Sequence, residues 1–173
     1  GIKGFVLSMI ETAVEVTDAR VTASVIRELV EAGKDMLAHP IELLPHAAET
    51  VAGLAPQARL VLITKGDLLD QERKLAQSGL GAHFDAVEIV SDKTRATYAR
   101  IFAGRPRAIM VGNSLRSDVI PALDAGAWGV HVPHEVTWSY EQDEPPQHHP
   151  RFRVLPDLGG LPQLVADISR LSP

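Results

Sequence analysis

The sequence predicts an α/β fold in which a parallel, Rossmann-type sheet is flanked by helices. From residue 59 onward, short apolar runs alternate with helical segments, and this alternation is typical of βαβ units. The apolar runs are mostly continuous, which suits strands that are covered on both faces. The 173 residues, of which 45% are hydrophobic, are enough for one domain or for a core with a small lobe.

The N-terminal part is predicted to be helical. In residues 4–38 the apolar side chains recur at spacings of three and four, which favours two helices and no strand. Thr17 or Thr22 is expected to cap the second of these helices. Residues 39–45 contain two prolines and are interpreted as a linker. A third helix is expected over 45–54, because proline is tolerated in a first helical turn.

The remaining elements follow in chain order. Short apolar runs predict five strands, over residues 59–64, 86–90, 107–113, 128–133 and 152–156. Helical segments are expected after four of the strands, over residues 67–78, 93–102, 117–125 and 161–171. The polar stretch 134–149 carries several prolines and is expected to be a loop.

Composition excludes several classes of function. The net charge is −5 and there is no long basic run, so neither nucleic acid nor an anionic membrane is expected as a partner. No apolar run approaches the ~18 residues that a membrane helix needs. The chain has no cysteine, which rules out a disulfide framework and a thiolate metal site. We therefore expect a cytoplasmic protein, and the sequence does not indicate its oligomeric state.

Polar groups follow the first two predicted strands. In open parallel sheets, ligands bind at the carboxyl ends of the strands. The first strand ends in Thr64, and its hydroxyl, with the backbone amides of Lys65 and Gly66, is suited to an oxyanion. Lys93 follows the second strand, and a cation before a helix indicates an anionic partner because it opposes the helix dipole. The structural alternatives are a helix cap for Thr64 and an ordinary exposed side chain for Lys93.

The third predicted strand ends in the segment "IMVGNSLRSD", residues 109–118. Asn113 and Asp118 are five residues apart across a strand-to-helix turn. Amide and carboxylate oxygens are hard ligands suited to Mg²⁺. Gly112 and Ser114 are expected to let the backbone approach a ligand closely. The alternative for Asp118 is a helix-capping role.

The order and spacing of these segments resemble the haloacid dehalogenase (HAD) superfamily over about residues 45–170. "GNSLRSD" looks like the fourth motif of that family, and "ALDAGAWGVHV" looks like its usual continuation. "LVLITKGD" is similar to the second motif and "SDKT" to the third. The resemblance implies a HAD-like core over residues 45–173 that lacks its first strand, with a helical cap remnant and linker over residues 1–44.

The resemblance also implies an activity, which is Mg²⁺-dependent hydrolysis of a small phosphomonoester through an aspartyl-phosphate. The substrate would be a small phosphorylated metabolite, selected by the cap and by the loop 134–149. The residues implied to bind it are Thr64, Lys65, Gly66 and Lys93. Of these, Thr64 and Lys93 are implied to be catalytic through their contacts with the phosphate. The implied metal ligands are Asp118 and Asn113.

Two departures from the family pattern leave alternatives open. The nucleophile of the family lies in a DxDx(T/V) segment at the end of its first strand, and the sequence has no such segment. We expect that aspartate upstream of Gly1, so residues 1–173 by themselves should not hydrolyse a phosphate ester. Asn113 stands where the family often has aspartate, which removes one negative charge. The alternatives are a metal-independent haloacid dehalogenase and a non-catalytic binding or interaction protein on the same fold.

Overall fold

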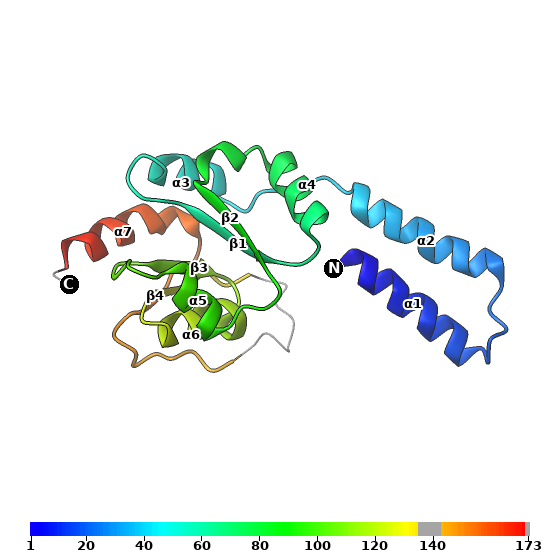
Figure 1. The fold of residues 1–173 in the computed structure, drawn as a ribbon. Helices are drawn as coiled ribbons and strands as arrows, with labels where there is room; N and C mark the ends of the chain where they lie inside the picture. Colours follow the sequence, from blue (N-terminus) through cyan, green and yellow to red (C-terminus); the bar gives the residue numbers. More distant parts are fainter. Residues whose placement is uncertain (135–142, 172–173) are drawn as a thin grey trace.

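The computed structural model describes residues 1–134 and 143–171 (Figure 1). The N-terminal helices are α1 (Ile2–Val16), α2 (Ala23–Ala38) and α3 (Ala47–Leu54). The middle of the chain forms β1 (Val61–Lys65), α4 (Leu68–Ser78), the 3₁₀ turn η1 (Gly81–His83), β2 (Ala86–Val90) and α5 (Arg95–Ile101). The last part forms β3 (Ile109–Gly112), the π-helical turn η2 (Leu115–Val119), α6 (Ile120–Asp124), β4 (Trp128–His131), β5 (Phe152–Val154), the 3₁₀ turn η4 (Leu158–Gly160) and α7 (Leu161–Arg170). This is the predicted α/β fold.

The strands are all parallel to their neighbours but form two sheets, β1–β2 and β3–β4–β5. Residue Val61 of β1 pairs with Ala86 of β2, and Ile109 of β3 pairs with Trp128 of β4. Within the described residues, β1 and β3 are not paired with each other, so each has one open edge. The predicted site residues lie at the carboxyl ends of the parallel strands, within the strand for Thr64 and Lys65 and in the following segment for the others.

Helices cover both faces of the β3–β4–β5 sheet, as Figure 1 shows. On one face, Val130 of β4 packs with Leu54 of α3 and Leu161 of α7. On the other face, Met110 of β3 packs with Tyr98 of α5. Successive strand residues point to opposite faces, so a continuous apolar run provides apolar side chains that pack against the helices on both faces. Each fully buried aliphatic side chain of this kind contributes about 1.5–3 kcal/mol to stability.

The helices α1 and α2 lie side by side and extend away from the sheets (Figure 1). Thr22 caps α2, because its side chain accepts a hydrogen bond from the Val25 amide. Gly33 is buried within α2, since a Cβ there would lie 2.3 Å from Cγ2 of Val6. In the part of the chain that the structure describes, no helix is both long and apolar enough to cross a membrane.

Near the site, the helices predicted over 93–102 and 117–125 begin later than expected. The helix predicted over 93–102 begins at Arg95, because the Thr94 side chain accepts from the Thr97 amide and acts as its cap. Lys93 therefore lies before the helix and not in its first turn. The helix predicted over 117–125 is preceded by the π-helical turn η2, which has Ser114 as its cap. Residues 135–142 of the loop predicted over 134–149 lie outside the described residues.

Candidate active site

Lys93 and Asp118 meet at the rim where β2 and β3 end. The Lys93 Nζ atom donates to Asp118 Oδ1 at 2.7 Å. The side chains are 17% and 6% exposed, respectively. Lys93 is therefore not an ordinary exposed lysine, and a largely buried ion pair of this kind joins two sheets that share no backbone hydrogen bonds in the described chain. Its short charge-assisted hydrogen bond is of the strong class.

The turn η2 folds the Asp118 side chain back toward the end of β3. The second carboxylate oxygen, Oδ2, accepts from the Ser114 backbone amide at 3.2 Å. The Ser114 carbonyl accepts from the amides of Asp118 and Val119, at 3.0 and 3.1 Å, which gives the wide turn. The cap of η2 is the Ser114 hydroxyl, which accepts from the Ser117 amide at 3.0 Å. Asp118 is not the N-cap residue, but the bond from the Ser114 amide to its side chain closes the first turn in the manner of a capping box. The capping alternative for Asp118 therefore holds alongside its contact with Lys93.

Gly112 makes room for this carboxylate. A Cβ at Gly112 would lie 2.4 Å from Asp118 Oδ2 and 2.5 Å from Asp118 Cβ. Atoms do not approach so closely without a bond, so a larger residue would push Asp118 out of place. We expected the glycine to let a ligand approach the backbone, and the structure shows that it first accommodates the neighbouring aspartate.

Tyr98 supports the same turn from inside α5. Its side chain is fully buried, and its hydroxyl donates to the Ser117 carbonyl at 3.0 Å. Residue 121, four positions after Ser117, is a proline and has no amide hydrogen for an α-helical bond to that carbonyl. Burial and the neighbouring Asp118 carboxylate raise the pKa of Tyr98 well above its usual value, so the phenol stays protonated and donates.

Thr64, at the end of β1, faces α4. Its hydroxyl donates to Gln71 Oε1 at 2.9 Å. The cap of α4 is Asp67, whose side chain accepts from the Asp70 amide at 3.1 Å, so the capping alternative for Thr64 is wrong.

Asp67 also accepts from Lys3 Nζ of α1 at 3.1 Å. The bond from Lys3, followed by the Asp70 amide, holds the pKa of Asp67 below its usual value.

Lys65 is engaged by Asp92 across the ends of β1 and β2. Its Nζ atom lies 3.0 Å from Asp92 Oδ1, which also accepts from the Lys93 amide at 3.0 Å. The bond from Lys65, together with the Lys93 amide, lowers the pKa of Asp92. Both side chains are exposed, so this pair contributes little to stability. It nevertheless places Lys65 beside the segment that carries Lys93.

Oxygen donors suited to Mg²⁺ lie at the end of β3. Asn113 is exposed. Its backbone carbonyl accepts a hydrogen bond from His131 Nε2 at 3.0 Å. Mg²⁺ often takes one or two protein ligands and keeps waters or substrate phosphate as the others, so Asp118 with Asn113 is a donor set that fits this ion. No group of three or more His, Cys, Asp or Glu side chains forms a metal site among the described residues. Further oxygens would have to come from water, from substrate or from other parts of the protein.

Two residues that shape this rim, Tyr98 and Gln71, were not predicted from the sequence. Both lie inside predicted helices, and their positions in the helical pattern do not distinguish them from the neighbouring helix residues. A signal existed for Tyr98, because a tyrosine on the apolar face of a helix needs a partner for its hydroxyl. No comparable signal existed for Gln71.

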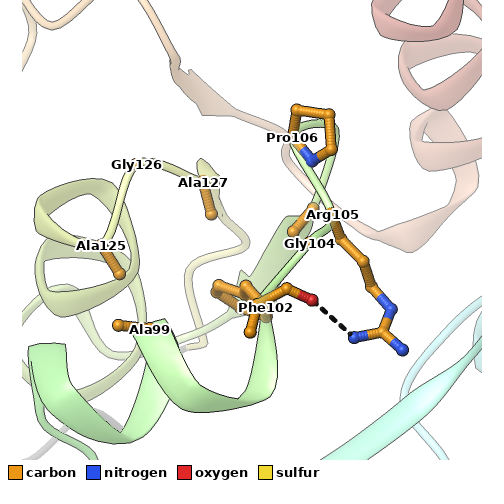
Figure 2. A pocket seen from close by; sticks show the side chains of 10 residues that line it. Ala99, Phe102, Gly104, Arg105, Pro106, Ala125, Gly126 and Ala127 are labelled. Atoms are coloured by element: carbon orange, nitrogen blue, oxygen red, sulfur yellow. Dashed lines mark hydrogen bonds between the residues drawn. The ribbon is translucent and has the colours of Figure 1, made fainter.

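A pocket of about 420 Å³ lies at the opposite rim, beside the beginning of β3 and β4. It is lined mostly by alanine, glycine and proline, and Figure 2 shows the Arg105 side chain turned away from Ala125 and Ala127. The Arg105 guanidinium donates to the Ala103 carbonyl at 3.2 Å. With no acid or nucleophile in its lining, this pocket is not a candidate for the chemistry described above.

Comparison with models of known protein families gives no match to this chain, and comparison with curated proteins gives none either. Among solved structures, the chain is similar to a haloacid dehalogenase-like family hydrolase from Xanthomonas campestris. The two share 44% sequence identity with a TM-score of 0.86, over 97% of this chain and 73% of that one.

Two other similar structures differ from each other in activity. One, described as a predicted phosphoglycolate phosphatase from Haemophilus somnus, is 15% identical with a TM-score of 0.63, over 92% of this chain and 75% of that one. The other is the L-2-haloacid dehalogenase from Xanthobacter autotrophicus with chloropropionic acid covalently bound. It is 20% identical with a TM-score of 0.56, over 91% of this chain and 82% of that one. At these identities the likeness establishes the fold alone.

Proposed function

Since this chain belongs to the haloacid dehalogenase-like hydrolases, we propose that it provides the phosphate-binding and metal-binding part of a Mg²⁺-dependent phosphomonoester hydrolase. The observation that carries this proposal is the contact between Lys93 and Asp118 at the rim of the sheets. A lysine held in place by a buried carboxylate, and still partly exposed, can present positive charge to a phosphate without moving. The cation can neutralise a phosphoryl oxygen, and the neighbouring oxygen donors can hold a metal ion. Phosphoryl transfer requires both.

The residues of the rim would divide the binding of phosphate and metal among them. Lys93 would neutralise a phosphoryl oxygen, while Asp118 orients its ammonium through Oδ1. The Thr64 hydroxyl would donate to a second phosphoryl oxygen, with the Lys65 and Gly66 amides near it. Mg²⁺, when held by Asp118 and Asn113, would supply the remaining positive charge that the phosphate requires.

Asp118, the carboxylate beside Lys93, is assigned to the metal, and we propose that an aspartate upstream of Gly1 supplies the nucleophile. The support for this is the split sheet, in which β1 and β3 each have an open edge. A groove of about 520 Å³ lies beside the first part of β3, and Leu60, Ile109 and Val111 are among its apolar lining residues. Parallel strands are normally covered and paired, so a further strand in this gap would complete the sheet. Its carboxyl end would then lie at the rim of Lys93 and Asp118.

The substrate that we propose is a small phosphorylated metabolite in the cytoplasm. We propose that the helices α1 and α2 contribute to its selection. The Lys3–Asp67 ion pair supports such a role for α1, since it joins that helix to the turn that follows Thr64 and Gly66.

The test uses full-length protein, with the residues that precede Gly1, and a generic aryl phosphate. We expect hydrolysis that needs Mg²⁺ and stops with a chelator, and a loss of at least about a hundredfold in kcat/KM for Lys93→Met. Arg170→Met is the control, because Arg170 forms an exposed ion pair with Asp167 on α7, away from the rim and from the helices proposed to select the substrate. Equal activity of the Lys93 variant and its control would overturn the proposal. Halide release from a 2-haloacid without metal would instead favour a dehalogenase.

A further inference from the structure

Gln71 spans the turn that is proposed to bind phosphate. Its Oε1 atom accepts from the Thr64 hydroxyl at 2.9 Å in a partly buried contact. Its Nε2 atom lies 3.0 Å from the position that a Cβ of Gly66 would occupy. The backbone of Gln71 is held as well, because its amide donates to the Asp67 carbonyl at 3.0 Å. The carboxamide therefore lies against Thr64 and Gly66, two of the residues that would bind the anion.

The Thr64 hydroxyl has a single hydrogen, and in this structure Gln71 receives it. The oxygens of a phosphomonoester dianion only accept hydrogen bonds, so Thr64 must turn this hydrogen toward the substrate. A hydroxyl can still accept a bond while it donates one. A glutamine carboxamide carries a donor and an acceptor on the same planar group, so rotation of this group about its terminal bond would present Nε2 to Thr64 in place of Oε1.

We propose that Gln71 is a positioning residue that turns its carboxamide when phosphate binds, and this inference rests on the function proposed above. In the free protein, Thr64 donates to Gln71. With phosphate present, Gln71 Nε2 donates to Thr64 Oγ1, and Thr64 donates to a phosphoryl oxygen. Consecutive bonds of this kind polarise one another, so the relay strengthens the contact with the anion and holds Thr64 in one rotamer.

Two substitutions separate this role from simple packing. In Gln71→Glu, an ionised carboxylate can only accept, so it would retain the Thr64 hydrogen and repel the phosphate. A protonated carboxyl regains a donor, and carboxyl groups gain protons as the pH falls toward about 4. Gln71→Met keeps a similar length and provides neither donor nor acceptor. The matched control is Gln77→Glu, which introduces the same charge at an exposed position of the same helix.

The experiment measures the affinity of the full-length protein for inorganic phosphate by calorimetry between pH 4.5 and 8, with circular dichroism to check folding. At pH 8 we expect Gln71→Glu to bind at least about tenfold more weakly than the wild type, Gln71→Met several-fold more weakly and Gln77→Glu equally well. Relative to the wild type at each pH, the deficit of Gln71→Glu should shrink as the pH falls. The deficit of Gln71→Met should not change.

The inference is overturned if Gln71→Glu and Gln77→Glu bind phosphate equally, or if the deficit of Gln71→Glu is the same at every pH. If Gln71→Glu does not fold, Gln71→Met decides the matter, and wild-type affinity in that variant overturns the inference. Thr64→Val separates the two proposals. Weaker phosphate binding by Thr64→Val with normal binding by the Gln71 variants contradicts only the inference. A wild type that does not bind phosphate contradicts the proposed function itself.

Discussion

The ammonium of Lys93 lies 2.7 Å from Asp118 Oδ1, and the other oxygen of that carboxylate accepts from the Ser114 amide at 3.2 Å. One buried carboxylate thus fixes the position of a cation and closes the turn after β3. The same arrangement makes the stability of the rim and its ligand binding depend on the same few atoms.

Lys93→Met should destabilise the protein by about 3 kcal/mol, because it leaves the Asp118 carboxylate buried without its cation. The double variant Lys93→Met with Asp118→Leu should recover part of that loss, since it removes both charges. Urea unfolding of the wild type, the single variants and the double variant gives the coupling free energy. Additive losses would contradict the buried pair. Lys34→Met, in an exposed pair with Glu31, should have little effect on the free energy of unfolding.

Gly112→Ala should cost about 1–3 kcal/mol of stability and should weaken Mg²⁺ binding by the full-length protein, because the added methyl group collides with the Asp118 carboxylate. Thermal unfolding and Mg²⁺ calorimetry measure the two effects. The comparison variant is Gly53→Ala in α3, where a Cβ would meet no atom within 4 Å. That change should stabilise the helix by about 0.5–1 kcal/mol. A Gly112 variant that binds Mg²⁺ normally would show that Asp118 does not need this space.

Tyr98→Phe should lower stability by about 1 kcal/mol, since it removes the hydroxyl donor to the Ser117 carbonyl but keeps the buried ring. It should also weaken Mg²⁺ binding, because the turn that carries Asp118 loses its support. Phe102→Leu perturbs the same core cluster, as Phe102 stacks on Tyr98 at 5.5 Å. That control should lower the melting temperature without a matching loss of Mg²⁺ affinity. Equal losses of affinity in both variants would assign Tyr98 a purely structural role.

Asn113→Asp should raise the Mg²⁺ affinity of the full-length protein, because a second carboxylate adds negative charge to the donor set. Calorimetry with Mg²⁺ measures the change, and Asn113→Ala is the comparison that removes the side-chain oxygen. Asn113 is exposed, so neither change should disturb the fold. If the three proteins bind Mg²⁺ equally, position 113 is not a metal ligand.

Stability should fall as the pH drops below about 4, and Asp70 should account for part of that fall. The hydrogen bond from Arg73, with help from Lys74, holds the pKa of the Asp70 carboxyl below its usual value in the folded protein. As the pH falls, Asp70 therefore gains its proton in the unfolded chain before it does so in the folded protein. The contribution of ionised Asp70 to the free energy of unfolding is complete above the pKa in the unfolded chain, and it is lost as the pH falls through the pKa in the folded protein. Urea unfolding between pH 3 and 6 should show a shallower pH dependence for Asp70→Asn than for the wild type. Asp35→Asn, at an exposed position of α2, should leave the slope unchanged.

Much of the fold follows from local sequence patterns. The residues of β2, Ala86–Val90, coincide with the predicted strand, and α4 begins one residue after its predicted start at Asp67. Element boundaries near the site were less predictable. The cap of α5 is Thr94, so this helix begins later than predicted. A π-helical turn, η2, precedes α6, and in it the Asp118 side chain lies close to Gly112.

The sequence by itself determined the α/β class and the positions of Lys93 and Asp118 just beyond strand ends. It could do so because continuous apolar runs, and their alternation with helical segments, are patterns formed by residues that are close together in the chain. The tertiary structure decided which side chains touch. Lys93 and Asp118 are 25 residues apart, and their contact depends on how two sheets approach each other. Tyr98 and Gln71 reach the rim from helices, where the angle at which a helix packs decides what its side chains meet, and that angle is set by the whole core.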